Sequence, residues 1–385
     1  MKNTSISRLK NFKHCPLSYL YTYVDKFTPV EKQPIWVQTK GLVLHETFEA
    51  LTIIENYNGT GEFNDIPLKE GEKFLEPSWW KAFGGKVENG IKHEPIVVAA
   101  QTKVREATNE QVMDAFKYAM ELNNFPIEKA IEYNLKKGLK RWLSFKHDYL
   151  DKRGTTLYAE KRYDEVLFGE TKTTTILDLL EDLGDGNYII YDYKTPKSVD
   201  VERYKEQLIL YAYTMACVKG LIKPVDTNPQ SIKTSYTGAI CDGVARSDPA
   251  VLTTETLVIG NEFEQVAKHF KLFVFFPLVD LKTDSYEKCL REVPFTAEDV
   301  AEVLADVKKT CDIIDGYDFS RPAEVLQLSN PNFQCKWCAF CGAKPQPDTL
   351  SEGGRSFEGC PITAFVGMAP TNSEFEPVLK KTGTS

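Results

Sequence analysis

Two carboxylates and a lysine lie close together in the segment TTTILDLLEDLGDGNYIIYDYKT, residues 173–195. Asp178 belongs to the first of two apolar runs, and Asp192 and Lys194 belong to the second. The sequence Gly-Asp-Gly at 184–186 separates the two runs and is a turn signal. The segment therefore predicts a β-hairpin that carries charged side chains on otherwise apolar strands.

The length of the hairpin loop decides which side chains share a face. A two-residue loop would place Asp178 across from Tyr193, on the face opposite Asp192. A three-residue loop, with Gly186 in the left-handed position of a bulge, would place Asp178 directly opposite Asp192. Their Cβ atoms would then be ~5 Å apart, and Lys194 would project from the same face.

Two ionised carboxylates at that separation repel each other, and a divalent cation removes the repulsion. Carboxylate oxygens suit Mg²⁺ or Mn²⁺, and a neighbouring lysine can orient an attacking water. The alternative is a surface hairpin in which Asp192 simply pairs with Lys194. Apolar neighbours favour burial of the charges, which is costly without a partner or a metal. These neighbours are Ile176, Leu180, Ile189 and Ile190.

A cysteine cluster indicates a second metal centre. Three of the nine cysteines lie within seven residues, at Cys335, Cys338 and Cys341. Without a secretion signal such a cluster favours metal ligation over disulfides. Cys15, before the helix-starting Pro16, could complete the set. Spacing alone leaves tetrahedral zinc and an iron–sulfur cluster open.

Helices and strands must position these groups, and the apolar periodicity predicts where they lie. Short N-terminal helices are expected near Ile6 and after Pro16. Residues 57–95 look irregular, and the helical region 99–150 is broken near Pro126. The other expected elements are a helix over 40–55, three strands within 157–195, and helices over 202–218 and 296–315, the last capped by Thr296.

Composition excludes several classes of function. The 385 residues are 42% hydrophobic and 26% charged, as in an ordinary globular protein, and the net charge of -8 does not suggest a general polyanion binder. A local basic channel remains compatible with that charge. Gly84-Gly85-Lys86 continues into Val87, so a phosphate-binding loop is absent from this segment. The N-terminus lacks an apolar signal region and no apolar run reaches ~20 residues, so a cytoplasmic protein without a membrane partner is expected.

The motifs resemble the PD-(D/E)XK nuclease signature. Asp178 followed by Asp192-x-Lys194 matches its core, and Gln207-x-x-x-Tyr211 on the next helix resembles the last motif of the RecB-like branch. Gly41-x-x-x-His45, with Glu49 a turn later, resembles the first motif of that branch. Each motif also has a purely structural interpretation. His45 could be a core histidine, and Gln207 and Tyr211 could belong to an apolar stripe that packs in the core.

The cysteines are similar to the staple of iron–sulfur members, which include the AddB-type nuclease and CRISPR-associated adaptation exonucleases. There an N-terminal cysteine and a C-terminal trio hold a [4Fe–4S] cluster. This implies a cluster on Cys15, Cys335, Cys338 and Cys341, with zinc as the alternative metal. The last gap in this chain is tighter than usual, which makes Cys360 the substitute fourth ligand.

The resemblance implies a restriction-endonuclease-like α/β (α+β) core, with a mixed central sheet flanked by helices and with helical and β-rich insertions. The expected layout is one nuclease domain over 1–345, followed by a flexible tail over 346–385. Its parts are N-terminal helices 5–55, a helical insertion about 56–156, a catalytic core 157–218, a β-rich insertion about 219–295, and the C-terminal helix and cysteine cluster 296–345.

The implied function is a Mg²⁺- or Mn²⁺-dependent deoxyribonuclease, expected to be an exonuclease on single strands or duplex ends in recombination, repair or replication-end processing. His45, Asp178, Asp192 and the carbonyl of Tyr193 would hold the metal. Lys194 would position the water, with Gln207 and Tyr211 beside the site. A protein partner is compatible with this function, and the oligomeric state is open. The alternative is a non-catalytic module that keeps the fold and binds DNA or a protein.

Overall fold

A computed structural model describes residues 3–26, 36–60, 63–68, 85–95, 106–153, 155–168, 171–196, 198–224, 261–279 and 285–316. The chain divides into two compact units. The larger comprises Met1–Ile6, Pro34–Tyr236 and Ala250–Asp315. The smaller comprises Ser7–Gln33, Thr237–Pro249 and Gly316–Ser385. Each unit is described by itself below.

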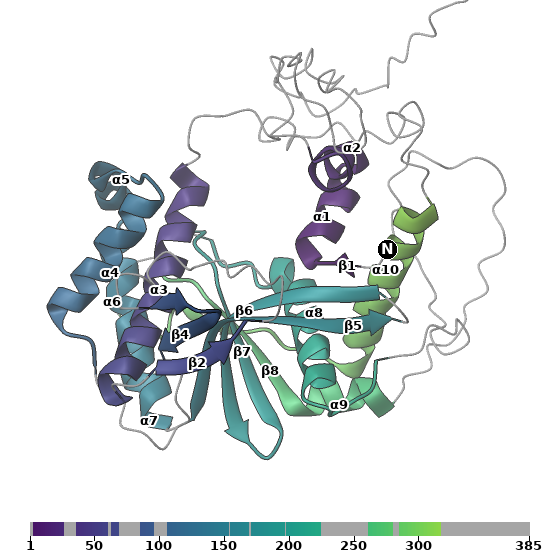
Figure 1. Cartoon of the computed structure of the whole chain (residues 1–385). Helices are drawn as coiled ribbons and strands as arrows, with labels where there is room; N and C mark the ends of the chain where they lie inside the picture. Colours follow the sequence, from purple (N-terminus) through teal and green to yellow (C-terminus); the bar gives the residue numbers. More distant parts are fainter. Residues whose placement is uncertain are drawn as a thin grey trace, which may run out of the picture. The chain divides into compact units, whose positions relative to one another are not determined.

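The larger unit is built on a mixed six-stranded sheet (Figure 1). Its main path runs β1-β6-β7-β8-β9, and β5 pairs with β6 beside that path. The strands are β1 (Asn3–Thr4), β5 (Thr156–Phe168), β6 (Thr171–Gly184), β7 (Asn187–Tyr193), β8 (Phe270–Phe275) and β9 (Leu290–Glu292). The predicted strand–strand–turn–strand order over 157–195 is confirmed. β8 and β9, which the sequence placed in an insertion, instead extend the central sheet beyond β7.

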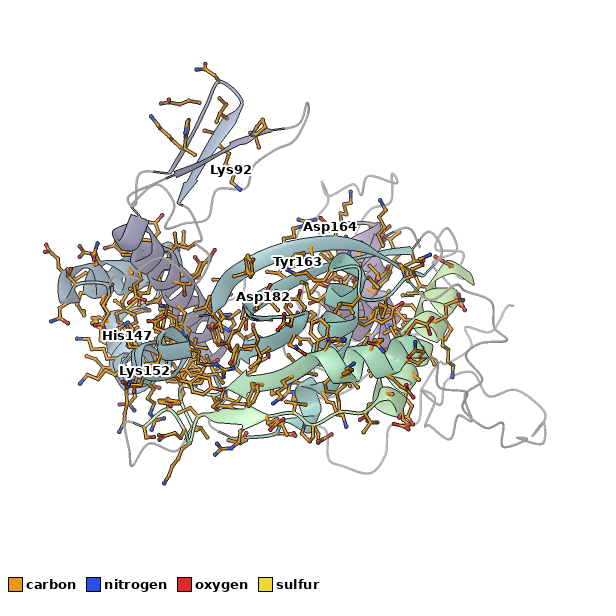
Figure 2. The ribbon with its side chains drawn as sticks, turned by 90° about the horizontal axis from the view of Figure 1, so that it is seen from below. Lys92, His147, Lys152, Tyr163, Asp164 and Asp182 are labelled. Atoms are coloured by element: carbon orange, nitrogen blue, oxygen red, sulfur yellow. The ribbon has the colours of Figure 1, made fainter. Side chains whose placement is uncertain are left out.

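The long strand β6 organises the sheet. β5 pairs antiparallel along one edge of β6, from Thr156 opposite Asp182 to Phe168 opposite Thr171. The other edge is shared, because β7 pairs antiparallel with the end of β6 and β1 pairs parallel with its beginning. In Figure 2, the labels Tyr163 and Asp182 mark β5 and β6 on either side of this pairing. The middle of β6 is therefore where β7 ends and where a polar side chain can reach the end of that strand.

Helices cover both faces of the sheet. α8 (Glu202–Val218) packs on β5, β6, β7 and β8, and its bounds agree with the predicted helix 202–218. On the face that carries Tyr191 and Tyr193, aromatic rings from α3 (Trp36–Thr60) and α6 (Leu135–Phe145) fill the core. Phe48 lies 5.3 Å from the Tyr193 ring, and Phe145 lies 5.4 Å from the Tyr191 ring. The two layers thus bury β7 from both sides.

A helical layer lies beside α3 and contains α4 (Asn109–Leu122), α5 (Ile127–Glu132), α6, the π-helical turn η3 (Lys146–Leu150) and α7 (Asp151–Arg153). The predicted break near Pro126 is confirmed, since Pro126 is the N-cap residue of α5. A second break follows at Asn134, which has a left-handed backbone with φ 57°. The capping box between Thr108 and Gln111 starts α4.

The stretch expected to be irregular contains a small sheet. β2 (Phe63–Pro67), β4 (Ile91–Pro95) and β3 (Lys86–Glu88) pair antiparallel in that order, and Figure 2 shows Lys92 on this sheet. A tight turn at Asn89 and Gly90, both with positive φ, joins β3 to β4. The irregular reading of 57–95 is therefore wrong for these residues, because the short strands carry too few apolar residues for an alternating signal.

Two further helices complete the described chain. α9 (Asn261–His269) leads into β8, and α10 (Ala297–Gly316) follows Thr296, the predicted cap residue. Thr296 and Asp299 exchange hydrogen bonds of the capping type, with Thr296 N–H to Asp299 Oδ2 at 2.8 Å and Asp299 N–H to Thr296 Oγ1 at 3.3 Å. Within the described part of the chain, no helix is long and apolar enough to cross a membrane.

In the smaller unit, α1 (Ile6–His14, from Ser7 on), α2 (Pro16–Tyr19) and the π-helical turn η1 (Leu20–Val24) are described. Cys15 caps α2 with an extended backbone, and Pro16 takes the first helical position. The rings of Phe12 and Tyr19 meet edge to face at 5.4 Å. The helix restart predicted at Cys15-Pro16 is thus confirmed.

Candidate active site

The turn between β6 and β7 sets the register of the hairpin. Asp185 and Gly186 form a two-residue turn with φ values of 51° and 74°, and Gly184 pairs with Asn187. The pairing then shifts at a bulge between Asp182 and Gly184. From there it runs from Asp182 opposite Tyr188 to Leu179 opposite Tyr191.

One further step of this register places Asp178 opposite Asp192. The sequence left the loop length open and required an odd-length loop or a bulge for this register; the structure has a bulge before a two-residue turn. Its consequence for the register is the same as that of a three-residue loop, since a bulge also shifts the pairing by one residue. Asp178 also contacts the end of β7 directly, where its Oδ2 accepts a hydrogen bond from the N–H of Tyr193 at 2.5 Å.

Asp192 is a buried carboxylate on the central strand, with a relative exposure of 2%. Its Oδ1 accepts a hydrogen bond from Gln207 at 3.2 Å, and its Oδ2 lies 2.5 Å from the Lys194 ammonium. The predicted burial of its surroundings is confirmed for Leu180, Ile189 and Ile190. Ile176 is 45% exposed and does not contribute, because it lies on β6 beyond the stretch that pairs with β7.

His45 reaches the hairpin from α3. Its Nε2 lies 2.9 Å from the carbonyl oxygen of Tyr193, and its Nδ1 lies 3.4 Å from Asp178 Oδ1. Gly41, one turn earlier, allows this approach: a Cβ at that position would lie 3.2 Å from Thr195 Oγ1. Gly41 therefore approaches Thr195 just after β7, and His45 contacts Tyr193, the last residue of β7. Glu49 is half-buried one turn further along.

α8 contributes the amide and phenol of the last motif. Gln207 Nε2 lies 2.9 Å from the Tyr211 hydroxyl as well as 3.2 Å from Asp192 Oδ1. The i, i+4 spacing places both side chains on the helix face that meets the sheet. Tyr204, which the sequence did not single out, lies under Lys194, with the ammonium 5.3 Å from its ring centroid.

The surroundings separate the pKa values of the two carboxyl groups. Burial alone would raise the pKa of Asp178, but His45, Lys194 and the Tyr193 N–H outweigh it and lower the pKa. Burial raises the pKa of Asp192, and the charge of Asp178 adds to this in spite of Lys194. Burial alone would lower the pKa of Lys194, but the two carboxylates raise it. A cation bound between the carboxylates would favour the ionised form of Asp192.

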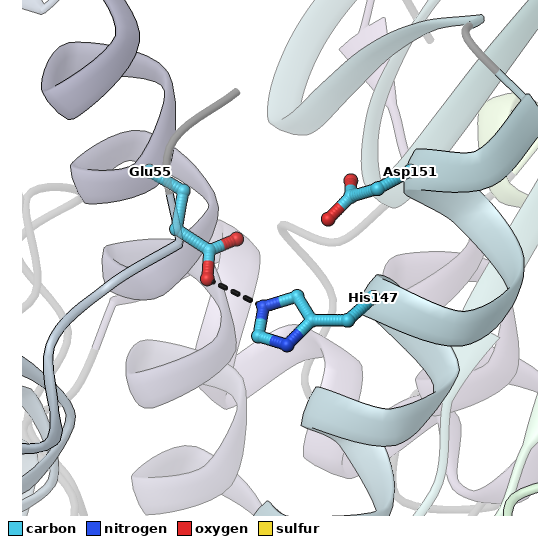
Figure 3. Close-up of side chains that lie close together, drawn as sticks. All are labelled: Glu55, His147 and Asp151. Atoms are coloured by element: carbon cyan, nitrogen blue, oxygen red, sulfur yellow. Dashed lines mark hydrogen bonds and ion pairs between the residues drawn. The ribbon is translucent and has the colours of Figure 1, made fainter. Parts of the chain in front are cut away.

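A second cluster of ligand-type side chains lies away from the hairpin (Figure 3). One ligand atom each of Glu55, His147 and Asp151 lies within 4.8 Å of the other two. Lys146 already contacts both acids, with its ammonium 2.7 Å from Glu55 Oε2 and 2.8 Å from Asp151 Oδ1. His147 Nε2 lies 2.7 Å from Glu55 Oε1. Because the lysine charge fills the space between the carboxylates, this group is a buried ion-pair network.

Sequence reasoning missed this network because its partners are far apart in the chain. Glu55 and His147 are separated by 92 residues. The i, i+4 pair His147 and Asp151 was the one local signal. Of the predicted cysteine cluster, the structure describes Cys15, while Cys335, Cys338, Cys341 and Cys360 lie outside the described residues.

Two facing carboxylates beside a lysine could hold a divalent metal that activates water. A family model described as the PD-(D/E)XK nuclease superfamily matches residues 3–343. The chain therefore belongs to the PD-(D/E)XK nuclease superfamily. A comparison with curated proteins gave no match. Membership implies a nuclease that uses a divalent metal and acts on DNA.

The residues at the hairpin fit such a metal. Two carboxylates and an imidazole supply the oxygen and nitrogen atoms that Mg²⁺ or Mn²⁺ accepts. Asp192 is buried beside a second acid, an arrangement that a divalent cation stabilises. The ligand atoms of His45, Asp178 and Asp192 are spread more widely than those of the Glu55 network. Lys194 accounts for part of this, because it holds one oxygen of Asp192 at 2.5 Å.

Proposed function

We propose that this chain is a Mg²⁺- or Mn²⁺-dependent deoxyribonuclease of the RecB-like branch, an exonuclease that acts on single strands or duplex ends. The observation that carries the proposal is the register of the β6–β7 hairpin, which sets Asp178 against Asp192 beside Lys194. The family membership supports the general activity. The branch, the exonuclease mode and a role in recombination, repair or end processing rest on the resemblance of the motifs.

Each residue has a proposed role. Asp178, Asp192, His45 and the Tyr193 carbonyl would hold the metal, which when bound supplies a Lewis acid for the phosphate and its attacking water. Lys194 orients the water and offsets negative charge as the phosphodiester is cut. Gln207 orients Asp192 through the 3.2 Å hydrogen bond, and Tyr211 in turn holds the Gln207 amide.

The cysteines are proposed to staple the two ends of a nuclease domain that spans 1–345. Cys15, Cys335, Cys338 and Cys341 would hold a [4Fe–4S] cluster, with Cys360 as the substitute fourth ligand. Cys15 supports the proposal by its place at the start of α2, where the backbone is held by Pro16. An anaerobic preparation that is brown and contains iron is expected. A colourless protein with bound zinc would show that the staple is a zinc site.

A digestion assay tests the nuclease proposal. Single- and double-stranded DNA, labelled at the 5′ or the 3′ end, is incubated with Mn²⁺ and with wild type or Lys194→Ala. We expect wild-type cleavage from an end and a loss of about 10²–10³-fold in the variant. The matched control is Lys271→Ala on β8, an exposed lysine whose removal leaves cleavage unchanged. Digestion of DNA by Lys194→Ala at the wild-type rate would refute the nuclease proposal.

The assay also separates the two classes of function. A wild-type protein that binds DNA and cuts none with Mg²⁺ or Mn²⁺ would be a binding module on the nuclease fold. The paired charges of Asp178, Asp192 and Lys194 weigh against that outcome, because a buried set of this kind is costly to keep without a metal.

A further inference from the structure

A pocket of about 350 Å³ lies on the helical layer, formed by α5 and the first half of α6. Its lining combines apolar and basic side chains: Ile127, Ala130, Ile131, Asn134, Lys136, Lys137 and Lys140. Asn134, which has a left-handed backbone, joins the two helices at the pocket. The lining contains lysines and no carboxylate.

The charge and exposure of this pocket are unusual for the chain. Ile127 is 46% exposed and Ile131 is 68% exposed, so an apolar surface is open to water. Lys136 and Lys140 are exposed and, at i, i+4 on α6, project from one helix face. Glu132 is already paired with Lys129 at 2.6 Å. In a chain with a net charge of -8, the pocket is a local basic site with an apolar floor.

The helices that form the pocket also contact α3. A Cβ at Gly138 on α6 would lie 3.5 Å from Leu44 Cδ1, beside the closer Leu278 and Pro277. The Lys40 ammonium lies 5.1 Å from the ring centroid of Tyr133, the residue before Asn134. α6 packs on both α5 and α3.

We propose that this α5–α6 pocket binds a single-stranded segment of the DNA substrate. Lys136 and Lys140 would contact successive phosphates, and Ile127 and Ile131 would carry an unstacked base. A duplex keeps its base faces inside the stack and would leave the apolar floor unused, which favours a single strand. The proposal rests on the proposed nuclease function and names the part of the chain that holds its substrate.

Binding without cleavage tests the charge contribution. A fluorescein-labelled oligothymidylate is titrated in EDTA with wild type, Lys136→Ala/Lys140→Ala and the control Lys268→Ala/Lys271→Ala, which removes the same charge from exposed sites on α9 and β8. The pocket variant is expected to raise the Kd for oligothymidylate by about 10-fold. It should also reduce the slope of log K against log salt by about 1.4, the value for two contacts on a single strand. An unchanged Kd and slope would overturn the proposal.

An abasic oligonucleotide of equal length tests the apolar floor. It keeps the phosphates and removes the bases, so wild type is expected to bind it several-fold more weakly than oligothymidylate. In Ile127→Ser/Ile131→Ser this difference should disappear, while circular dichroism confirms the fold. Equal binding of duplex and single strand, with no effect of abasic sites, would refute the single-strand assignment. It would leave a surface that binds only phosphates.

Hydrolysis of bis(p-nitrophenyl) phosphate separates this proposal from the nuclease proposal. The small diester does not reach the pocket, so Lys136→Ala/Lys140→Ala should cleave it at the wild-type rate while its KM for DNA rises. Lys194→Ala should lose activity on both substrates. Wild type could cleave neither DNA nor the small diester while Lys136→Ala/Lys140→Ala still binds oligothymidylate more weakly than wild type. That result would refute the nuclease proposal and support the proposal that the pocket binds a single strand.

Discussion

His45 Nε2 lies 2.9 Å from the carbonyl oxygen of Tyr193, although 148 residues separate the two in the chain. A carbonyl oxygen only accepts hydrogen bonds, so Nε2 carries the proton. The ring is thereby oriented by the main chain of β7, and Nδ1 faces Asp178 Oδ1 at 3.4 Å. In the neutral tautomer, Nδ1 and the Asp178 carboxylate would both be available as ligands for a cation.

Replacement of this imidazole should weaken metal binding. In His45→Ala, we expect the Mn²⁺ concentration for half-maximal cleavage to rise at least about 10-fold, as for a lost ligand or ligand partner. Calorimetric titration with Mn²⁺ should show the same change without DNA. Leu42→Ala is the matched control, because Leu42 lies on the same helix and is 56% exposed. Equal Mn²⁺ affinity of His45→Ala and wild type would exclude His45 from the metal site.

The close approach of Gly41 to Thr195 makes activity sensitive to a side chain at residue 41. A Cβ would already lie 3.2 Å from Thr195 Oγ1, and the branched methyls of Gly41→Val would push the residue next to Lys194. A displacement of about 1 Å can cost about 10²-fold in rate, so we expect a loss of at least about 10-fold in kcat. The melting temperature should change little, since helix α3 gains a better helix former than glycine. Wild-type kcat in Gly41→Val would show that Thr195 can move without affecting Lys194.

The buried network of Glu55, Lys146, His147 and Asp151 should stabilise the contact between α3 and the helical layer. Glu55 is fully buried, and Glu55→Gln would leave the Lys146 ammonium without one of its two carboxylates. Breaking a buried pair costs about 3–5 kcal/mol, which corresponds to roughly 6–20 °C in Tm for a unit of this size. Lys152→Ala, which breaks an exposed pair with Asp148, is expected to shift Tm by no more than about 2 °C. Equal Tm shifts in Glu55→Gln and Lys152→Ala would contradict a stabilising role for the buried network.

The same network predicts how stability depends on pH. The hydrogen bond to Glu55 raises the pKa of His147 above its ordinary 6.5. A raised folded-state pKa means that this stabilisation is complete below 6.5 and is lost as the pH rises through the folded value. The pKa of Glu55 is lowered: burial would raise it, but His147 and Lys146 outweigh burial. Its contribution is therefore lost only as the pH falls below the ordinary 4.5.

The measurement is the difference in Tm between wild type and His147→Gln. It should be larger at about pH 6 than at about pH 9, because only the protonated imidazole is favoured by Glu55. Glu55 stays ionised across that range and does not obscure the change. A difference that grows with pH would reverse the sign and refute the raised pKa of His147.

Local signals in the sequence were enough to predict the core of the site. The Gly-Asp-Gly turn, the apolar strands and the i, i+4 pair Gln207 and Tyr211 each act over a few residues, and the structure has them where they were expected. The route to the register differed, because a two-residue turn with a bulge and a three-residue loop shift the pairing by the same amount. The sequence thus left the facing of Asp178 and Asp192 dependent on the turn, and the bulge in the structure decided it.

What the sequence could not show depends on contacts between distant segments. Glu55 meets Lys146 and His147 only after α3 packs on the helical layer, and no periodicity reports that pairing. The sequence analysis assigned β8 to an insertion because its parallel partner β7 lies about 80 residues earlier. Parallel strands are not joined by a short turn, so the sequence between them carries no local signal of the pairing. The small sheet of β2, β3 and β4 was missed because its strands are short and polar.

The ring of Tyr204 should position Lys194 for its role at the scissile phosphate. The ammonium lies 5.3 Å from the ring centroid of Tyr204 and 2.5 Å from Asp192 Oδ2. A cation–π contact is worth about 0.5–2 kcal/mol, so Tyr204→Leu should lower kcat by about 2–30-fold. Tyr204→Phe keeps the ring and should retain wild-type kcat, while both variants bind oligothymidylate as wild type does. A Tyr204→Phe protein as slow as Tyr204→Leu would point to the hydroxyl instead, and unchanged kcat in both would remove Tyr204 from the positioning of Lys194.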